Sequence, residues 1–195
     1  NELVAGCTFA AVMLIYWIWA VSGKMADGVR KGLAWVVAAV GLVFALFTGV
    51  AYMIETIPSW NTIAGPVQMI GFALLGGAAV GVLVLTLSGC ADQLRSGSLR
   101  TAVLAVVAAG LVLGIGGFAV QATAASGMSN PLVSGADLVA SAMMVVACGI
   151  ICLVGTGVCD TFAVRGAKAG ALVGVSTGAV VLALVGILLM RLAFY

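Results

Sequence analysis

Residues 63–87 read IAGPVQMIGFALLGGAAVGVLVLTL, a stretch without Asp, Glu, Lys or Arg. A helix of this length can span the hydrocarbon core of a bilayer, which requires about 20 apolar residues. The apolar residues are continuous and do not alternate with polar ones, so the stretch does not have the pattern of a membrane-spanning β-strand. It therefore predicts a transmembrane helix.

Apolar stretches of similar length flank this one on both sides. The predicted spans cover residues 3–21, 32–53, 63–87, 99–121, 138–158 and 169–194. Hydrophobic residues fill 64% of the 195 positions and charged residues 7%, which leaves too little polar surface for an ordinary soluble domain. We therefore expect an all-α integral membrane protein whose six helices form a single transmembrane domain over residues 1–195.

Basic residues are confined to alternate loops between the spans. Seven of the eight fall in three short loops, namely Lys24, Arg30, Lys31, Arg95, Arg100, Arg165 and Lys168. The loops around Glu55 and Asp137 carry none. Because cytoplasmic loops of membrane proteins are enriched in Lys and Arg, the pattern predicts that both chain ends lie outside and the basic loops inside. The net charge of +2 follows from this topology and gives no indication of nucleic-acid binding.

The sequence contains no histidine, and none of its five cysteines forms a CxxC pair. Haem b in a helical bundle normally needs axial histidine, and zinc and copper sites usually need imidazole. An iron–sulfur cluster needs about four thiolates at loop-like spacings. We therefore expect no metal or haem in this chain, and we interpret the cysteines as packing residues.

Glycines recur at intervals of four residues in two spans. Gly166, Gly170, Gly174 and Gly178 form overlapping GxxxG steps at the start of the last span, and these predict a helix-packing seam. Gly110 and Gly114 make another such step in the fourth predicted span, where scattered membrane glycines are the alternative explanation.

Charged side chains are absent from the centres of the spans, which disfavours a proton- or ion-driven carrier. The predicted topology instead brings Glu2, Glu55, Asp137 and Arg191 to the outer surface. A carboxylate at an apolar boundary can serve as the base that quinol oxidation requires, because the ring must release its protons. The alternative is that these are ordinary interfacial charges and that Arg191 snorkels to the headgroups.

One loop and both chain ends resemble segments of a known protein family. Residues 52–62 read YMIETIPSWNT and lead into the glycine-rich span, while residues 1–6 read NELVAG and residues 191–195 read RLAFY. These segments resemble the membrane-anchor subunit of the bacterial dimethyl sulfoxide reductase family. The resemblance implies that the sequence corresponds to helices three to eight of an eight-helix anchor and lacks the first two.

The resemblance also implies a function. Such an anchor oxidises menaquinol near the outer face of the bacterial cytoplasmic (inner) membrane and passes electrons to an iron–sulfur partner subunit, while a molybdenum subunit carries out the terminal reaction. The molybdenum cofactor and the iron–sulfur clusters are expected in those partners. Glu2 matches the family's glutamate at the start of its third helix and is the candidate proton acceptor. Tyr52, Trp60 and Arg191 are candidates for the quinol pocket or the docking surface. An acidic residue that the family places one turn before the final arginine is Ile187 here, so no role of that acid can be transferred.

Other functions remain open at this point. The protein could anchor a related complex of the polysulfide, nitrate or tetrathionate type, which co-purifying subunits would reveal. A small-solute transporter would show substrate flux in liposomes, and a purely structural subunit would be indifferent to quinone-site inhibitors.

Overall fold

A computed structural model describes residues 2–57, 60–95, 97–128, 134–166 and 168–193, and all regular secondary structure in these ranges is helical. The motif residues at positions 1, 58–59 and 194–195, and with them the predicted end of the last span at residue 194, lie outside the described ranges. The helices are α1 (Glu2–Val21), α2 (Asp27–Ala51), α3 (Ala64–Leu87), α4 (Ala91–Leu94), α5 (Gly97–Ser126), α6 (Gly135–Arg165) and α7 (Ala169–Leu192).

Six of these helices are long and apolar enough to cross a membrane, and α4 is a single turn between α3 and α5. The prediction of an all-α protein with six spans is therefore confirmed. The fourth and fifth spans are longer than predicted, because α5 extends to Ser126 and α6 to Arg165. The predicted spans ended at residues 121 and 158, whereas α5 continues for five further residues and α6 for seven.

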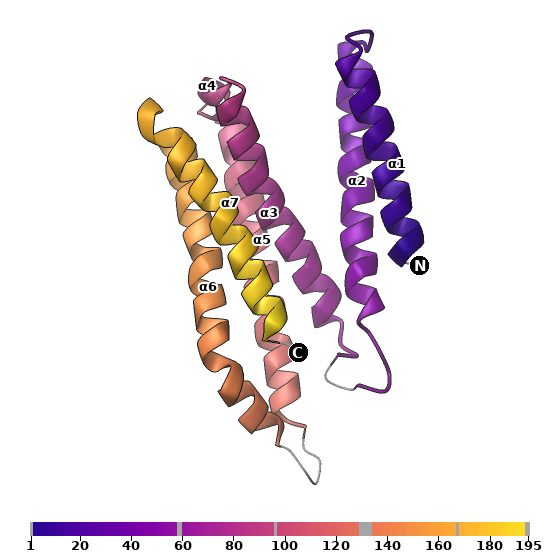
Figure 1. Ribbon diagram of the computed structural model, residues 1–195, viewed down its shortest axis with the longest axis vertical. Helices are drawn as coiled ribbons and strands as arrows, with labels where there is room; N and C mark the ends of the chain where they lie inside the picture. Colours follow the sequence, from indigo (N-terminus) through magenta and orange to yellow (C-terminus); the bar gives the residue numbers. More distant parts are fainter. Residues whose placement is uncertain (1, 58–59, 96, 129–133, 167, 194–195) are drawn as a thin grey trace.

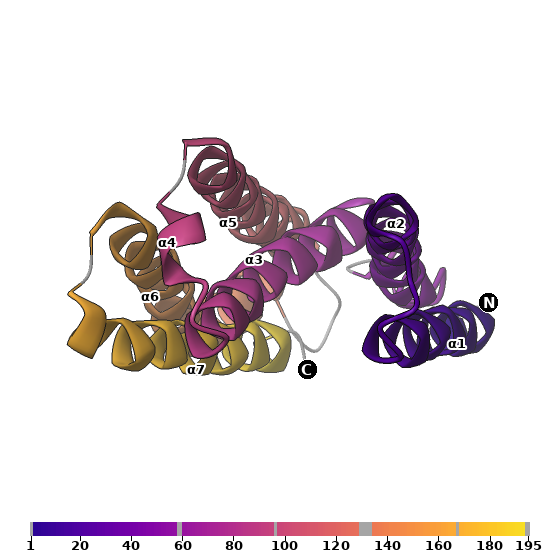
Figure 2. The same ribbon diagram turned by 90° about the horizontal axis from the view of Figure 1, so that it is seen from above.

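Helix α3 lies at the centre of the helix packing. It packs against α2, α5, α6 and α7, while α6 packs against α5 and α7 (Figures 1 and 2). Helices α1 and α2 form a hairpin at one side of the bundle, and its principal packing with the remainder is through α2 against α3. Helix α1 buries none of its residues, and α2 buries only Gly49.

Glycine brings α3 and α5 into backbone contact. A Cβ atom on Gly71 of α3 would overlap the backbone nitrogen of Gly114 in α5. One turn away, a Cβ on Gly110 would lie 2.8 Å from the backbone nitrogen of Leu75. Such close approach lets dispersion contacts hold two helices together in lipid, where the hydrophobic effect contributes little. The Gly110–Gly114 step, for which scattered glycines were the alternative, is thus a packing seam.

Among the described residues, Gly166, Gly170, Gly174 and Gly178 do not form the predicted packing seam. A Cβ on any of these glycines would meet no atom within 4 Å among its described surroundings. A helix turns once in 3.6 residues, so a strict four-residue repeat drifts around its axis by about 40° per step and leaves any one interface. The buried face of α7 instead follows alternating steps of four and three, at Leu172, Ser176, Ala179, Ala183, Gly186 and Met190.

The three basic loops lie at one end of the bundle. The α1–α2 turn, the segment around α4 and the α6–α7 connection are all at the top of Figure 1, and the α2–α3 and α5–α6 connections are at the bottom. We call these the basic end and the base-free end. The assignment of the basic end to the cytoplasm stays a prediction.

Candidate functional site

Three predicted site residues meet at the base-free end. The guanidinium carbon of Arg191 lies 4.2 Å from the centroid of the Tyr52 ring. The ring of Tyr52 in turn meets that of Trp60 edge to face, with centroids 6.1 Å apart and an interplanar angle of 69°. We call Tyr52, Trp60 and Arg191 the Arg191 cluster. It draws on three separate segments: the end of α2, the α2–α3 connection and the last turn of α7.

The helix packing explains how these segments meet. Tyr52 caps the end of α2, where its backbone N–H donates to the carbonyl of Gly49. Gly49 has no side chain, and a Cβ there would overlap Pro66 at the start of α3, so the two helix ends lie in backbone contact. Helix α3 also packs along α7, so the last turn of α7, which carries Arg191, reaches the Tyr52 ring.

The electrostatics of the cluster favour a fixed cation. Arg191, Tyr52 and Trp60 are all half-buried. A guanidinium over an aromatic face gains about 0.5–2 kcal/mol, with the larger values where water is excluded. Stacking therefore keeps the charge of Arg191 at a defined position beside two aromatic rings, at the depth where the helices end. Such an arrangement can hold an apolar ring that carries polar oxygens.

Glu2 stands apart from the cluster. It lies half-buried in the first turn of α1, and α1 packs on α2 at one side of the bundle (Figure 2). Glu2 therefore shares the base-free end with Arg191, but α1 and α7 are separate in Figure 2, and the principal packing of α1 is on α2. The other acids predicted for this surface, Glu55 and Asp137, are both exposed.

Sequence reasoning missed a buried amide near this end. Gln68 lies one turn inside α3 and is 1% exposed, and neither its Nε2 nor its Oε1 has a hydrogen-bond partner among the described residues. A buried amide without partners costs roughly 1–3 kcal/mol, so it is a group able to receive a polar ligand. The signal in the sequence is that residues 63–87 contain no other amide side chain.

Acidic and thiol side chains do not gather into a metal site in the described part of the protein. No group of three or more His, Cys, Asp or Glu residues there could hold an ion. All five cysteines are free thiols.

The sequence as a whole matches one protein family. The match, to the family described as DMSO reductase anchor subunit (DmsC), extends over residues 1–195. The protein belongs to this family. The resemblance inferred from residues 1–6, 52–62 and 191–195 is thereby confirmed.

Curated members of the DmsC family show moderate similarity to this one. The C subunit of anaerobic dimethyl sulfoxide reductase from Escherichia coli (strain K12) is 30% identical over 113 residues, which cover 57% of this chain and 39% of the relative. The corresponding C subunit from Haemophilus influenzae is 32% identical over 87 residues, covering 44% of this chain and 30% of the relative. The YnfH subunit of an E. coli anaerobic dimethyl sulfoxide reductase is 36% identical over 61 residues, covering 31% of this chain and 22% of the relative. The aligned regions thus span well under half of each relative, and no solved structure matches the sequence significantly.

This DmsC family member also carries a buried carboxyl near its basic end. Asp160 is 0% exposed, and neither of its carboxyl oxygens has a hydrogen-bond partner among the described residues. The predicted span ended at residue 158, so Asp160 was not recognised as part of a helix. Helix α6 continues to Arg165 and turns Asp160 into the bundle.

We expect the Asp160→Asn variant of this family member to keep its stability within about 1 kcal/mol, because the amide fills the same space and an unpaired buried charge is what would be costly. Thermal unfolding in detergent measures the change, with Asp137→Asn as an exposed control. A loss of several kcal/mol at Asp160 alone would contradict the interpretation of this carboxyl as partnerless.

Proposed function

We propose that the protein is the membrane-anchor part of a molybdenum oxidoreductase complex and oxidises menaquinol at its base-free end. The observation that carries the proposal is the stacking of Arg191 on Tyr52 beside Trp60, because it holds a cation against aromatic rings where three segments of a DmsC family member converge. Electrons would pass to an iron–sulfur partner subunit, and the molybdenum cofactor would lie in the catalytic partner.

The chemistry required of this protein is limited. Oxidation of a quinol to the quinone releases two electrons and two protons, so the site must hold the ring, bind its oxygens and accept the protons. Tyr52 and Trp60 offer aromatic surface for the ring, and the guanidinium of Arg191 can donate hydrogen bonds to an oxygen. The unpartnered amide of Gln68 is a second polar group near the same end of the bundle.

The base in this proposal is Glu2. It lies at the same end of the bundle as the Arg191 cluster but on α1, whose principal packing is on α2, so protons would reach it along the base-free surface. The topology that fits is one with both chain ends outside the bacterial cytoplasmic membrane. In this proposed topology, the six long helices correspond to the third to eighth helices of a longer anchor.

We expect Glu2→Gln, introduced into the full-length protein in its complex, to slow menaquinol oxidation at least tenfold, because a positioned base typically contributes about 10²–10⁴-fold. The complex should still assemble, since the change is isosteric. The rate is measured with a reduced menaquinol analogue in membranes and normalised to complex content, with exposed Glu55→Gln as the control. Unchanged turnover would remove Glu2 from the mechanism.

The proposed partner subunits are tested by identifying the proteins that co-purify with the full-length protein from detergent extract. A molybdenum subunit and an iron–sulfur subunit are the expected companions. The three relatives described above are all named as parts of anaerobic dimethyl sulfoxide reductases, which favours that type over the polysulfide, nitrate and tetrathionate types. Purification without redox subunits, together with solute flux in liposomes, would support the transporter alternative instead.

A further inference from the structure

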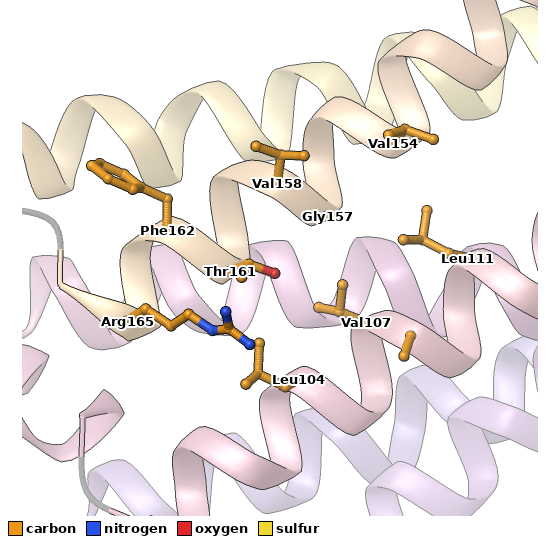
Figure 3. Close-up of a pocket in the computed structure, with 10 residues that line it drawn as sticks. Leu104, Val107, Leu111, Val154, Gly157, Val158, Thr161, Phe162 and Arg165 are labelled. Atoms are coloured by element: carbon orange, nitrogen blue, oxygen red, sulfur yellow. The ribbon is translucent and has the colours of Figure 1, made fainter.

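A groove runs between α5 and α6 in the half of the bundle near the basic end (Figure 3). Its cavity volume is about 490 Å³. Its walls are almost entirely apolar and include Leu104 and Leu111 of α5 and Val154, Val158 and Phe162 of α6. The three α6 side chains are exposed in the isolated protein, so the groove opens outward, where the membrane would surround the bundle.

Small residues hollow out the groove. Ala108 of α5 and Gly157 of α6 both line it. A Cβ on Gly157 would lie 2.8 Å from a methyl carbon of Leu111, so even one added carbon would crowd the floor. The groove has the cross-section for a flexible hydrocarbon chain lying along the helices, and no side chain of the described residues fills it.

One end of the groove carries positive charge. Arg165 lines it, and Figure 3 shows its guanidinium extending back over the groove toward Thr161 and Leu104. This direction follows from helix geometry, because side chains tilt toward the helix N-terminus and Arg165 stands in the last turn of α6. Neither of the two described ion pairs, Arg30–Asp27 and Arg95–Asp92, involves Arg165.

A second arginine lies near the same end of the groove, on the other helix. Arg100 precedes Leu104 by four residues in α5, so it lies on the same face of the helix, one turn nearer the basic end. The groove thus has apolar walls along its length and the guanidinium of Arg165 at one end, with Arg100 one turn beyond Leu104 on α5.

We propose that this groove binds one acidic phospholipid, with an acyl chain between α5 and α6 and the phosphate at Arg165. Charge complementarity selects the occupant: a basic pocket between membrane helices on the cytoplasmic side suits an anionic headgroup, and the apolar walls suit the hydrocarbon attached to it. A neutral phospholipid would leave the guanidinium of Arg165 without an anion. Free phosphate would leave the apolar walls uncovered.

The test measures lipid binding to the full-length protein in its membrane complex by native mass spectrometry. The complex is delipidated in detergent and titrated with palmitoyl-oleoyl phosphatidylglycerol, or with the corresponding phosphatidylcholine as the neutral lipid. We expect one saturable phosphatidylglycerol site with preference over phosphatidylcholine. Arg165→Gln should weaken it about fivefold, the effect typical of one basic residue near a lipid headgroup. Arg165→Lys should retain most of the affinity.

Two further variants separate charge from shape. Lys31→Gln removes one positive charge from the same end of the bundle, but from α2, and should leave the site unchanged. Ala108→Leu fills the groove from an exposed position and should weaken phosphatidylglycerol binding without changing any charge. Inorganic phosphate at the same concentration should not displace the lipid.

Three results would overturn the proposal. One is the absence of a saturable phosphatidylglycerol site. Another is equal weakening by Arg165→Gln and Lys31→Gln, which would indicate diffuse attraction to the whole basic end. The third is loss of co-purifying quinone from the Ala108→Leu variant while phosphatidylglycerol binding is unchanged, which would assign the groove to quinone.

Discussion

Replacing Gly71 with alanine is expected to destabilise the bundle by about 3 kcal/mol, at the upper end of the usual cost of overpacking. The added Cβ would overlap the backbone nitrogen of Gly114 and lie 2.7 Å from the Cα of Gly114 and from the carbonyl carbon of Leu113. All three atoms belong to the backbone of α5, so no rotamer change can make room. Helix α3 would have to move away from α5, and α3 is the helix against which α2, α5, α6 and α7 pack.

The control is another glycine of the same helix. A Cβ on Gly77 would meet nothing within 4 Å, so Gly77→Ala should leave stability unchanged or raise it slightly, since alanine favours helix over glycine by about 0.8–1.0 kcal/mol. Thermal unfolding of the detergent-solubilised protein, followed by the loss of monodisperse protein in size-exclusion chromatography, compares the two variants. Equal melting temperatures for Gly71→Ala and Gly77→Ala would contradict the close approach of α3 and α5.

On the proposed function, Arg191→Leu is expected to lower menaquinol oxidation at least tenfold in the full-length protein within its complex. The substitution removes the cation from the Tyr52 face and leaves no donor for a ring oxygen. One charge-assisted hydrogen bond contributes about 1.5–3 kcal/mol, and 1.4 kcal/mol corresponds to a tenfold change. Arg191→Lys keeps the charge but loses the planar guanidinium, so it should give an intermediate rate.

A double-mutant cycle distinguishes loss of the stacking contact between Arg191 and Tyr52 from a general effect of losing one positive charge. Tyr52→Leu removes the ring beneath Arg191, so combining it with Arg191→Leu should cost less than the sum of the single variants, by about 0.5–2 kcal/mol. Lys31→Gln, at the opposite end of the bundle, is the control for loss of one positive charge. Full turnover and normal assembly in Arg191→Leu would show that this arginine only snorkels to the headgroups.

Apolar runs and loop charges were sufficient to predict six helices and to place the basic loops at one end, because both patterns are local in sequence. The contacts between helices were not local. Gly49 and Pro66 bring the ends of α2 and α3 together, and only that approach, with the packing of α3 on α7, places Arg191 over Tyr52. The sequence could predict that these side chains share a surface, but not that they touch.

Errors arose where one spacing is compatible with two faces of a helix. The four-residue glycine repeat of α7 suggested a seam, but the true buried face follows a repeat of three and a half residues, and small residues other than glycine form much of it. Asp160 and Gln68 were missed for a related reason. Their burial depends on the neighbouring helices, and the adjacent residues show only that each is a polar group within or next to an apolar stretch.

The unequal attachment of the helices divides the molecule into two parts of different cohesion. The α1–α2 pair buries almost nothing of its own and adjoins the remaining helices along one line, whereas α3, α5, α6 and α7 enclose a shared interior. Separating the pair from α3 would break the packing of α2 on α3 but would leave the interior of the four-helix unit in place, since local opening is governed by the contacts that must be broken. Because Tyr52 ends α2 and Arg191 belongs to α7, the stacked pair spans the boundary between the two parts. A hydrophobic molecule moving within the bilayer could thus reach the guanidinium when the hairpin tilts outward, with no need for the core to unfold.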